Sequence, residues 1–208
     1  MDIDFADFAA GVARAAGQRL LQYQADGFEV MHKGAVDLVT TADKSSEQLI
    51  VNAIRARYPD HDIIAEESFE RDALRTRGEH GEPASPERSR RVEPRYRWYI
   101  DPIDGTTSFA HGYPGYAISI ALYENDDALL GVIYDPTRDE MFRATRGAGA
   151  TLNPGLSRAN GGRPVRVSET GALIESLLTT GFPYDVITSA RNVAEFNRLT
   201  LLTRGVRI

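Results

Sequence analysis

The spacing of apolar residues near the start of the chain predicts a helix. Apolar side chains recur every three or four residues over the first 20 positions, which puts them on one helical face. They are Phe5, Phe8, Ala9, Val12, Ala15, Ala16 and Leu20. Between Gly27 and Gly34, the segment FEVMHK predicts a strand or an extended loop.

A second helix is expected over residues 42–58, because Pro59 cannot continue it. Thr40, followed three residues later by Asp43, matches a helix-capping pattern. The buried stripe of this helix comprises Ser46, Leu49, Ile50, Ala53 and Ile54. Residues 62–65 then predict a short buried strand that leads into two glutamates.

Beyond Trp98 the apolar pattern changes to alternation with many β-branched residues, which is typical of strands. The four expected strands are 117–123, 128–134, 140–145 and 164–167. Their short connections predict an antiparallel meander. A further strand is expected at 176–181 and a helix at 189–204.

Residues 69–97 differ in composition from the rest of the chain. They contain eight arginines, six acidic residues and three prolines, with few large apolar side chains. Such a segment buries too little apolar surface to offset its loss of conformational entropy, so we expect a mobile insertion. A lid over an anionic substrate and an RNA-contacting arm are the alternatives.

The charge balance and the absence of cysteine narrow the possible functions. The 208 residues include 24 basic and 30 acidic side chains, and the net charge of −6 argues against nonspecific nucleic-acid or membrane binding. Without cysteine, disulfides, thiolate metal sites and a cysteine nucleophile are excluded. Because neither a signal-peptide pattern nor an apolar run of about 18 residues is present, a cytoplasmic enzyme is the default expectation.

The strongest local motif is WYIDPIDGTTSF, in which an apolar strand delivers Asp101 and Asp104. We expect Pro102 to stiffen a turn between them. Two carboxylates held in this way suit Mg²⁺, which prefers anionic oxygen ligands. Gly105 permits a tight turn, and residues 106–108 then look like a helix start whose N–H groups face an anion. The motif predicts a metal-dependent phosphatase, and a simple Asp-Pro turn with a helix cap is the alternative.

Two further acidic motifs precede it. In IIAEES, Glu66 is expected to bind metal and Glu67 to orient a metal-bound water, because adjacent carboxylates need a compensating cation or donor. A pair of surface glutamates is the alternative. In KGAVDLVTTADKSSE, which begins at Lys33, Asp37 and Asp43 flank an apolar segment. Asp43 either complements the helix dipole or orients a threonine hydroxyl that positions an attacking water.

Together these motifs resemble those of the inositol monophosphatase family, within the lithium-sensitive Mg²⁺-dependent phosphatases. The matching segments are DLVTTAD at 37–43, AEES at 65–68 and DPIDGTTSF at 101–109, with family-like strands in 131–153 and 163–169. The resemblance implies a layered α/β sandwich (α-β-α-β-α) of two subdomains, usually in a homodimer. It assigns residues 1–169 to an N-terminal metal-binding subdomain with an antiparallel sheet and residues 170–208 to part of a second subdomain.

The resemblance also implies roles for individual residues. The Mg²⁺ ligands would be Glu66, Asp101, the backbone carbonyl of Ile103, and Asp104. Asp43 and Thr106 would form the dyad that activates the attacking water, with Glu67 assisting at a metal-bound water. The phosphate would be bound by Gly105, Thr106 and Thr107, and Lys33 matches a basic residue near the metals.

The implied activity is hydrolysis of inositol monophosphate, or of a similar small sugar or polyol phosphate, by a metal-bound hydroxide. Fructose 1,6-bisphosphate, histidinol phosphate and nucleotide 3′-phosphates are substrates of enzymes with the same core. Ala65 and Ser108 replace the family's usual glycine and asparagine. The family's last metal-binding aspartate would lie beyond residue 208, so this chain alone is expected to be a poor phosphatase. A catalytically silent, RNA-associated scaffold of the same fold is the alternative.

Overall fold

The computed structural model describes residues 2–32, 38–68, 95–154 and 162–208. The chain divides into two compact units: the first is built from residues up to 165, and the second contains residues 166–208. No helix in these described ranges is long and apolar enough to cross a membrane. Lys33 and Asp37, which the sequence motifs singled out, lie outside the described residues.

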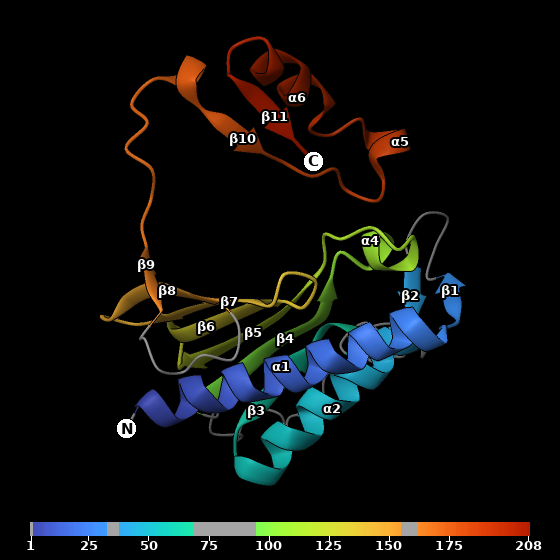
Figure 1. Cartoon of the computed structure of the whole chain (residues 1–208), viewed down its shortest axis with the longest axis vertical. Coiled ribbons are helices and arrows are strands. Elements are labelled where there is room, and N and C mark those ends of the chain that lie inside the picture. Colours follow the sequence, from blue (N-terminus) through green and yellow to red (C-terminus); the bar gives the residue numbers. More distant parts are fainter. Residues whose placement is uncertain (1, 33–37, 69–94, 155–161) are drawn as a thin grey trace, which may run out of the picture. The chain divides into compact units, whose positions relative to one another are not determined.

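Two long helices form one layer of the first unit (Figure 1). α1 (Asp2–Asp26) and α2 (Thr41–Arg57) pack against each other, where the apolar spacing predicted helices. The Thr40 hydroxyl accepts the N–H groups of Ala42 and Asp43 at 3.1 and 3.3 Å, while the Asp43 carboxylate accepts the Thr40 N–H. This reciprocal capping box confirms the predicted start of α2. Ahead of α2 lies an antiparallel pair of short strands, β1 (Val30–His32) and β2 (Leu38–Thr40).

A seven-stranded sheet forms the second layer of this unit. Its strands lie side by side in chain order: β3 (Asp62–Ala65), β4 (Tyr96–Asp104), β5 (Ala117–Glu124), β6 (Asp127–Asp135), β7 (Glu140–Thr145), β8 (Gly149–Pro154) and β9 (Arg163–Val165). β3 and β4 are parallel, and every other neighbouring pair in this sheet is antiparallel. The sheet is therefore mixed: the antiparallel meander expected for its later strands is confirmed, and the parallel pair of β3 and β4 adds to it. The long connection between β3 and β4 lets both strands run in the same direction.

The sequence pattern missed β8, which lies between β7 and β9. β8 begins at Gly149, with φ +78°, and Gly147 in the preceding turn has φ +79°. Glycine and alanine give a weak strand signal, so alternation does not mark this segment. Pairing with a strand on each side defines β8, and the meander contains one more strand than expected.

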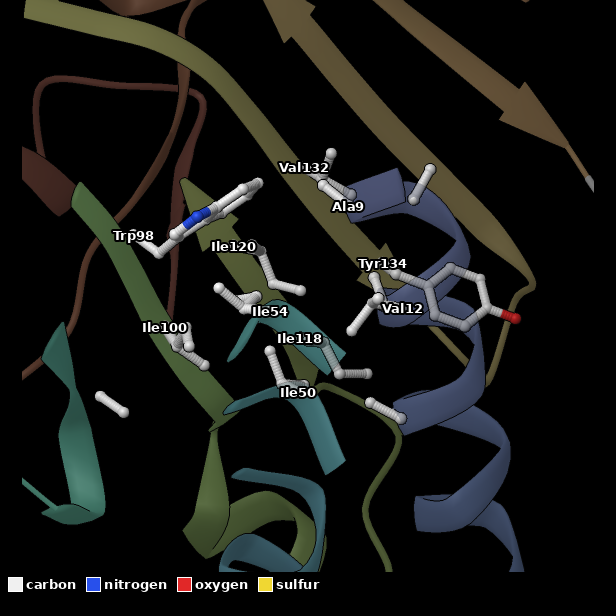
Figure 2. Packing of buried hydrophobic residues seen from close by; sticks show 14 of the residues in the cluster. Ala9, Val12, Ile50, Ile54, Trp98, Ile100, Ile118, Ile120, Val132 and Tyr134 are labelled. Atoms are coloured by element: carbon white, nitrogen blue, oxygen red, sulfur yellow. The ribbon is translucent and has the colours of Figure 1, made fainter. Parts of the chain in front are cut away.

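The core lies between the two helices and one face of the sheet. Figure 2 shows Ile118 and Ile120 of β5 in the same cluster as Ile50 and Ile54 of α2 and Val12 of α1. Alternate residues of β5 are buried, as the period of two in a strand requires. Each large apolar side chain buried in this way contributes roughly 1.5–3 kcal/mol. This packing fixes β3 and β4 relative to α2.

The mobile insertion was expected to extend to residue 97, but β4 begins before that position. Residues 69–94 lie outside the described residues, but Tyr96 and Arg97 are already part of β4. Arg97 Nε lies 2.9 Å from Asp62 Oδ2 of β3, and Arg95 Nη2 lies 2.6 Å from Glu124 Oε1 of β5. These arginines pair with carboxylates on neighbouring strands, so their charge concealed the start of a strand.

The second unit is small. Its parallel strands are β10 (Leu177–Thr179) and β11 (Gly205–Arg207), and its helices are a 3₁₀ turn (Leu173–Glu175), α5 (Val186–Ser189) and α6 (Val193–Thr200). The single helix expected over 189–204 was wrong in its extent. Ala190 and Asn192 adopt left-handed backbone angles, with φ 50° and 67°, and separate α5 from α6.

Candidate active site

Two of the acidic motifs meet at the carboxyl ends of β3 and β4. Ala65 of β3 is the register partner of Ile100 of β4, and the two strands are parallel. Glu66 and Asp101 therefore each come directly after the last residue that pairs β3 with β4, at the same end of the two strands. Asp104 follows at the end of β4. The sheet topology brings together carboxylates that lie far apart in the sequence.

An irregularity in β4 turns Asp101 and Asp104 toward the same face of the sheet. Asp101 pairs with Ser119 of β5 and Asp104 with Ala117, so three steps along β4 match two along β5. In a regular strand, residues three positions apart point to opposite faces, and one extra residue restores a common direction. Pro102 lies within β4. The turn that we expected it to stiffen is therefore an irregular part of the strand.

The carboxyl group of Asp101 lies where its ionised form is disfavoured. The pKa of Asp101 is raised to about 8, and burial is the largest cause. The charge of Glu66, a hydrogen bond with Glu66 and the charge of Asp104 raise it further, in that order. The Ile103 N–H donates to Asp101 Oδ1 at 3.1 Å and offsets part of this rise. Carboxylates crowded in this way need a shared proton or a cation.

The buried carboxylate of Asp43 contacts the hydroxyl of Thr106. Thr40 donates its N–H at 2.7 Å and its O–H at 2.6 Å to Asp43 Oδ2. Thr106 Oγ1 lies 3.0 Å from Asp43 Oδ1 and 3.1 Å from the carbonyl oxygen of Ile103. Because Asp43 is only 1% exposed, its carboxylate is a fixed acceptor for the Thr106 hydroxyl.

Gly105 makes the sharp turn from β4 into α4 (Thr106–Ala110). Its φ is +95°, and a Cβ at this position would lie 2.6 Å from the carbonyl oxygen of Gly115. Only glycine fits this turn without displacing the neighbouring backbone. The first N–H groups of α4, which lack acceptors within the helix, therefore begin two residues after Asp104.

The model of the inositol monophosphatase family matches residues 3–207. The chain belongs to this family. It is 42% identical over 203 residues to the inositol-1-monophosphatase of Synechocystis sp., covering 97% of this chain and 62% of that protein. It is 37% identical over 180 residues to the Nus factor SuhB of Escherichia coli, covering 86% of this chain and 58% of that protein. The chain thus spans about three fifths of the length of these curated relatives.

Among solved structures, an inositol monophosphatase from Anabaena (Nostoc) sp. is similar to this chain with a TM-score of 0.72 and 40% sequence identity. The similarity covers 98% of this chain and 66% of that one. It confirms the predicted α/β sandwich fold of the inositol monophosphatase family. The mixed sheet flanked by α1 and α2 is the part of this fold that the first unit contains.

Members of the inositol monophosphatase family are metal-dependent, and the donor set of this chain fits a cation. Glu66, Asp101 and Asp104 supply hard anionic oxygens, and a positive charge would relieve the crowding that raises the Asp101 pKa. Across the described ranges, however, no three acidic or histidine side chains are already gathered closely enough to hold a metal ion.

The structure separates the two adjacent glutamates. Glu66 is exposed beside Asp101, whereas Glu67 is buried, with 6% of its surface exposed. Thr107 is exposed in the first turn of α4, next to Thr106. The predicted phosphate-binding residue Lys33 lies outside the described residues.

The sequence patterns missed Glu47, which lies on α2 and is buried. Its carboxylate accepts the Glu67 N–H at 2.8 Å and also the hydroxyl of Ser68. One signal was available: Glu47 follows Asp43 by four residues, so the two lie on the same face of the helix. An acidic side chain in a buried stripe indicates a specific partner.

A shallow pocket of about 310 Å³ lies beside Glu66 and Asp101. Its lining also includes Ile64, Tyr99 and Ser119. Ser119 alternates with the buried Ile118 and Ile120, so this pocket is on the face of the sheet that points away from the core. It provides room for a small molecule next to the carboxylates.

Proposed function

We propose that this protein is a Mg²⁺-dependent phosphomonoesterase, active as a homodimer, that hydrolyses inositol monophosphate or a similar small sugar or polyol phosphate. The observation that carries the proposal is the 3.0 Å contact between Thr106 Oγ1 and Asp43 Oδ1. Thr106 lies two residues after Asp104, so the threonine of this carboxylate–hydroxyl pair is close in the chain to potential metal ligands. The family match and the name of the Synechocystis relative support the substrate class.

The cation would be held by Glu66, Asp101 and Asp104, with the carbonyl oxygen of Ile103 as a neutral ligand. These are the oxygen donors that Mg²⁺ prefers. When bound, Mg²⁺ supplies an activated water and neutralises the charge that develops on the phosphoryl oxygens. The exposed position of Glu66 beside the pocket is compatible with a ligand that approaches from solvent.

Asp43 and Thr106 would orient the attacking water. The Thr106 hydroxyl has one hydrogen, which it donates either to Asp43 Oδ1 or to the Ile103 carbonyl oxygen. Donation to the buried carboxylate leaves the hydroxyl oxygen as an acceptor for a water hydrogen. The water can then pass its proton to the hydroxyl oxygen while the hydroxyl proton moves to Asp43. Glu67 would help to orient the attacking water. Gly105, Thr106 and Thr107 would bind the phosphate through N–H and hydroxyl groups.

The test measures phosphate release from inositol 1-phosphate at saturating Mg²⁺, with the Synechocystis relative assayed alongside; this chain alone is expected to be the slower of the two. Loss of an acid–base group typically costs about 10²–10⁴ in rate, so Asp43→Asn should lower kcat by that factor. Ser45→Ala is the matched control on α2, because the Ser45 hydroxyl contacts Arg19 Nε at 3.1 Å and not the acidic cluster. Undiminished turnover by Asp43→Asn would contradict the proposed dyad. Fructose 1,6-bisphosphate, histidinol phosphate and a nucleotide 3′-phosphate complete the substrate panel.

A second candidate function is favoured by the name of another relative. The Escherichia coli protein that is 37% identical to this chain is named a Nus factor. This name supports the alternative of a catalytically silent, RNA-associated scaffold of the same fold. RNA binding that weakens with salt and survives removal of Mg²⁺, together with no phosphatase activity, would favour the scaffold.

A further inference from the structure

Glu47 is a buried carboxylate for which the proposed dyad and metal ligands provide no role. Its side chain is 4% exposed on α2. Moving a carboxylate out of water is costly unless hydrogen-bond donors replace the lost hydration. Here the donors include the Glu67 N–H, at 2.8 Å, and the Ser68 hydroxyl. Both belong to the segment that follows β3 and carries Glu66.

The same helix also holds the other half of the acidic cluster. Ser46, next to Glu47, donates its hydroxyl to the carbonyl oxygen of Pro102 at 3.3 Å, within the irregular part of β4. Asp43, one turn earlier, contacts Thr106 after β4. One face of α2 therefore makes hydrogen bonds to the segment after β3 and to the segment around the end of β4.

We propose that Glu47 is a positioning residue that sets Glu66 against Asp101 by holding the backbone of the adjacent residue, Glu67. The proposal rests on the proposed Mg²⁺-dependent function and deepens it. Glu67 and Ser68 follow Glu66 directly in the chain. The hydrogen bonds from both residues to the buried Glu47 therefore anchor the segment that carries Glu66.

The orientation of the Glu47 carboxylate supports positioning rather than metal ligation. Both Oε1 and Oε2 accept hydrogen bonds from the 67–68 segment, so each oxygen has a protein donor. Substitution of residues that hold metal ligands in place typically lowers metal affinity by about 10- to 100-fold. Glu47 is expected to act on Mg²⁺ affinity in this range, through Glu66.

The experiment measures Mg²⁺ affinity by titration calorimetry for the wild type, Glu47→Gln, Glu66→Gln and the double variant. Glu47→Gln keeps the size of the side chain but presents an amide N–H₂ to one of the two donors, and it should weaken Mg²⁺ binding about tenfold. If Glu47 acts through Glu66, the double variant should bind Mg²⁺ no more weakly than Glu66→Gln alone. A merely structural role would instead lower the unfolding midpoint without this dependence on Glu66.

Two further variants complete the design. Gln48→Ala is the matched control, because Gln48 is the next residue of α2 and its exposed side chain bonds to Asn52 at 2.7 Å. It should leave Mg²⁺ affinity unchanged. Ser68→Ala removes one donor to Glu47 without altering a charge, and it should weaken Mg²⁺ binding in the same direction by a smaller factor. Ser68→Ala decides the question if Glu47→Gln fails to fold.

Each outcome has a defined meaning. Weaker Mg²⁺ binding by Glu47→Gln that disappears in the Glu66→Gln background supports the positioning role. Wild-type affinity in both Glu47→Gln and Ser68→Ala, or independent additive losses in the double variant, would overturn it and leave the proposed function intact. A wild-type protein that binds no Mg²⁺ would overturn the proposed function together with this inference.

Discussion

The two units of the molecule differ sharply in how they treat apolar side chains. In the first unit, Ile54 and Trp98 are fully buried. In the second, Ile187 and Leu201 are 82% and 83% exposed, and Thr203 is the one buried residue among those described there. The second unit has a two-stranded sheet of three residues per strand, and a sheet of that size is marginal by itself. Among the residues that the structure describes, the buried apolar cluster is made by the first unit.

The candidate site follows the same division. All the described residues assigned to it lie in the first unit, on α2, on α4 or at the ends of β3 and β4. A site that needs fixed distances between carboxylates requires rigid support, which a packed core provides. We therefore expect the acidic cluster to depend on substitutions in the first unit and to be insensitive to those in the second.

The largest expected effect is on the free energy of unfolding. One substitution in each unit tests whether apolar side chains of the first unit contribute more to stability than those of the second. Ile54→Ala creates a cavity in the first unit and should lower the free energy of unfolding by about 2–5 kcal/mol. Ile187→Ala shortens an exposed side chain in the second unit and should change it by less than about 0.5 kcal/mol. Urea denaturation followed by circular dichroism provides both values. Similar losses for the two variants would show that the second unit is packed more tightly than its exposure indicates.

The next effect concerns the cation. Asp104→Asn removes a proposed ligand and should weaken Mg²⁺ binding by at least about tenfold, because even a residue that only supports a ligand has an effect of this size. Asp185→Asn is the control in the second unit, where Asp185 is exposed and pairs with Arg191 at 3.0 Å. Titration calorimetry should show wild-type affinity for Asp185→Asn. Equal affinity in all three proteins would remove Asp104 from the metal site.

Local signals made the first unit more predictable than the second. Thr40 and Asp43 lie three residues apart, so the capping box of α2 could be predicted from sequence alone. The alternation in β5 predicted its buried face in the same way. In the second unit, the break at Ala190 depends on a left-handed backbone angle that alanine rarely adopts. No residue type marked that position.

The site could be predicted only in part, because some of its geometry depends on neighbouring strands. The residue types of the acidic motifs indicated a cation, but the common direction of Asp101 and Asp104 comes from the irregular register with β5. The contact between Asp43 and Thr106 followed from the family resemblance and not from spacing. Glu47 was missed because no sequence motif encodes its bonds to the Glu67 N–H and the Ser68 hydroxyl, and only its spacing of four residues from Asp43 was a signal.

A smaller effect is the pH dependence of stability in the Mg²⁺-free protein. The folded pKa of Asp101 is raised to about 8, whereas an unfolded aspartate has a pKa of about 4. The folded state therefore keeps a proton that the unfolded state releases, and stability should fall as pH rises from about 4 to about 8. Asp101→Asn should flatten this slope, and so should added Mg²⁺ in the wild type. The pH dependence contributed by Asp185 has the opposite sign. The hydrogen bond from Arg191 lowers the pKa of Asp185, so the stability that Asp185 contributes is lost only at acid pH.

The smallest effect concerns the edge of the core in the first unit, where His61 lies against aromatic side chains. Trp98 Nε1–H donates to His61 Nδ1 at 3.0 Å, and the His61 ring stacks on Tyr58 with centroids 4.8 Å apart. Burial lowers the pKa of His61 from its ordinary value of 6.5, against the opposing charge of Asp60. The unfolded chain then binds a proton more readily than the folded one, so stability should decline as pH falls below about 6.5.

This decline can be separated from that of Asp101 because the two slopes have opposite signs. Urea midpoints between pH 5 and pH 7, measured in the Asp101→Asn background, isolate the contribution of His61. Trp98→Phe keeps an aromatic ring but removes the N–H donor, so Nδ1 of His61 can take up a proton without losing a hydrogen bond. The acid-side decline should therefore be smaller in Trp98→Phe, although the variant is less stable at every pH. An unchanged decline in that variant would show that burial and the charge of Asp60, without the bond to Trp98, set the pKa of His61.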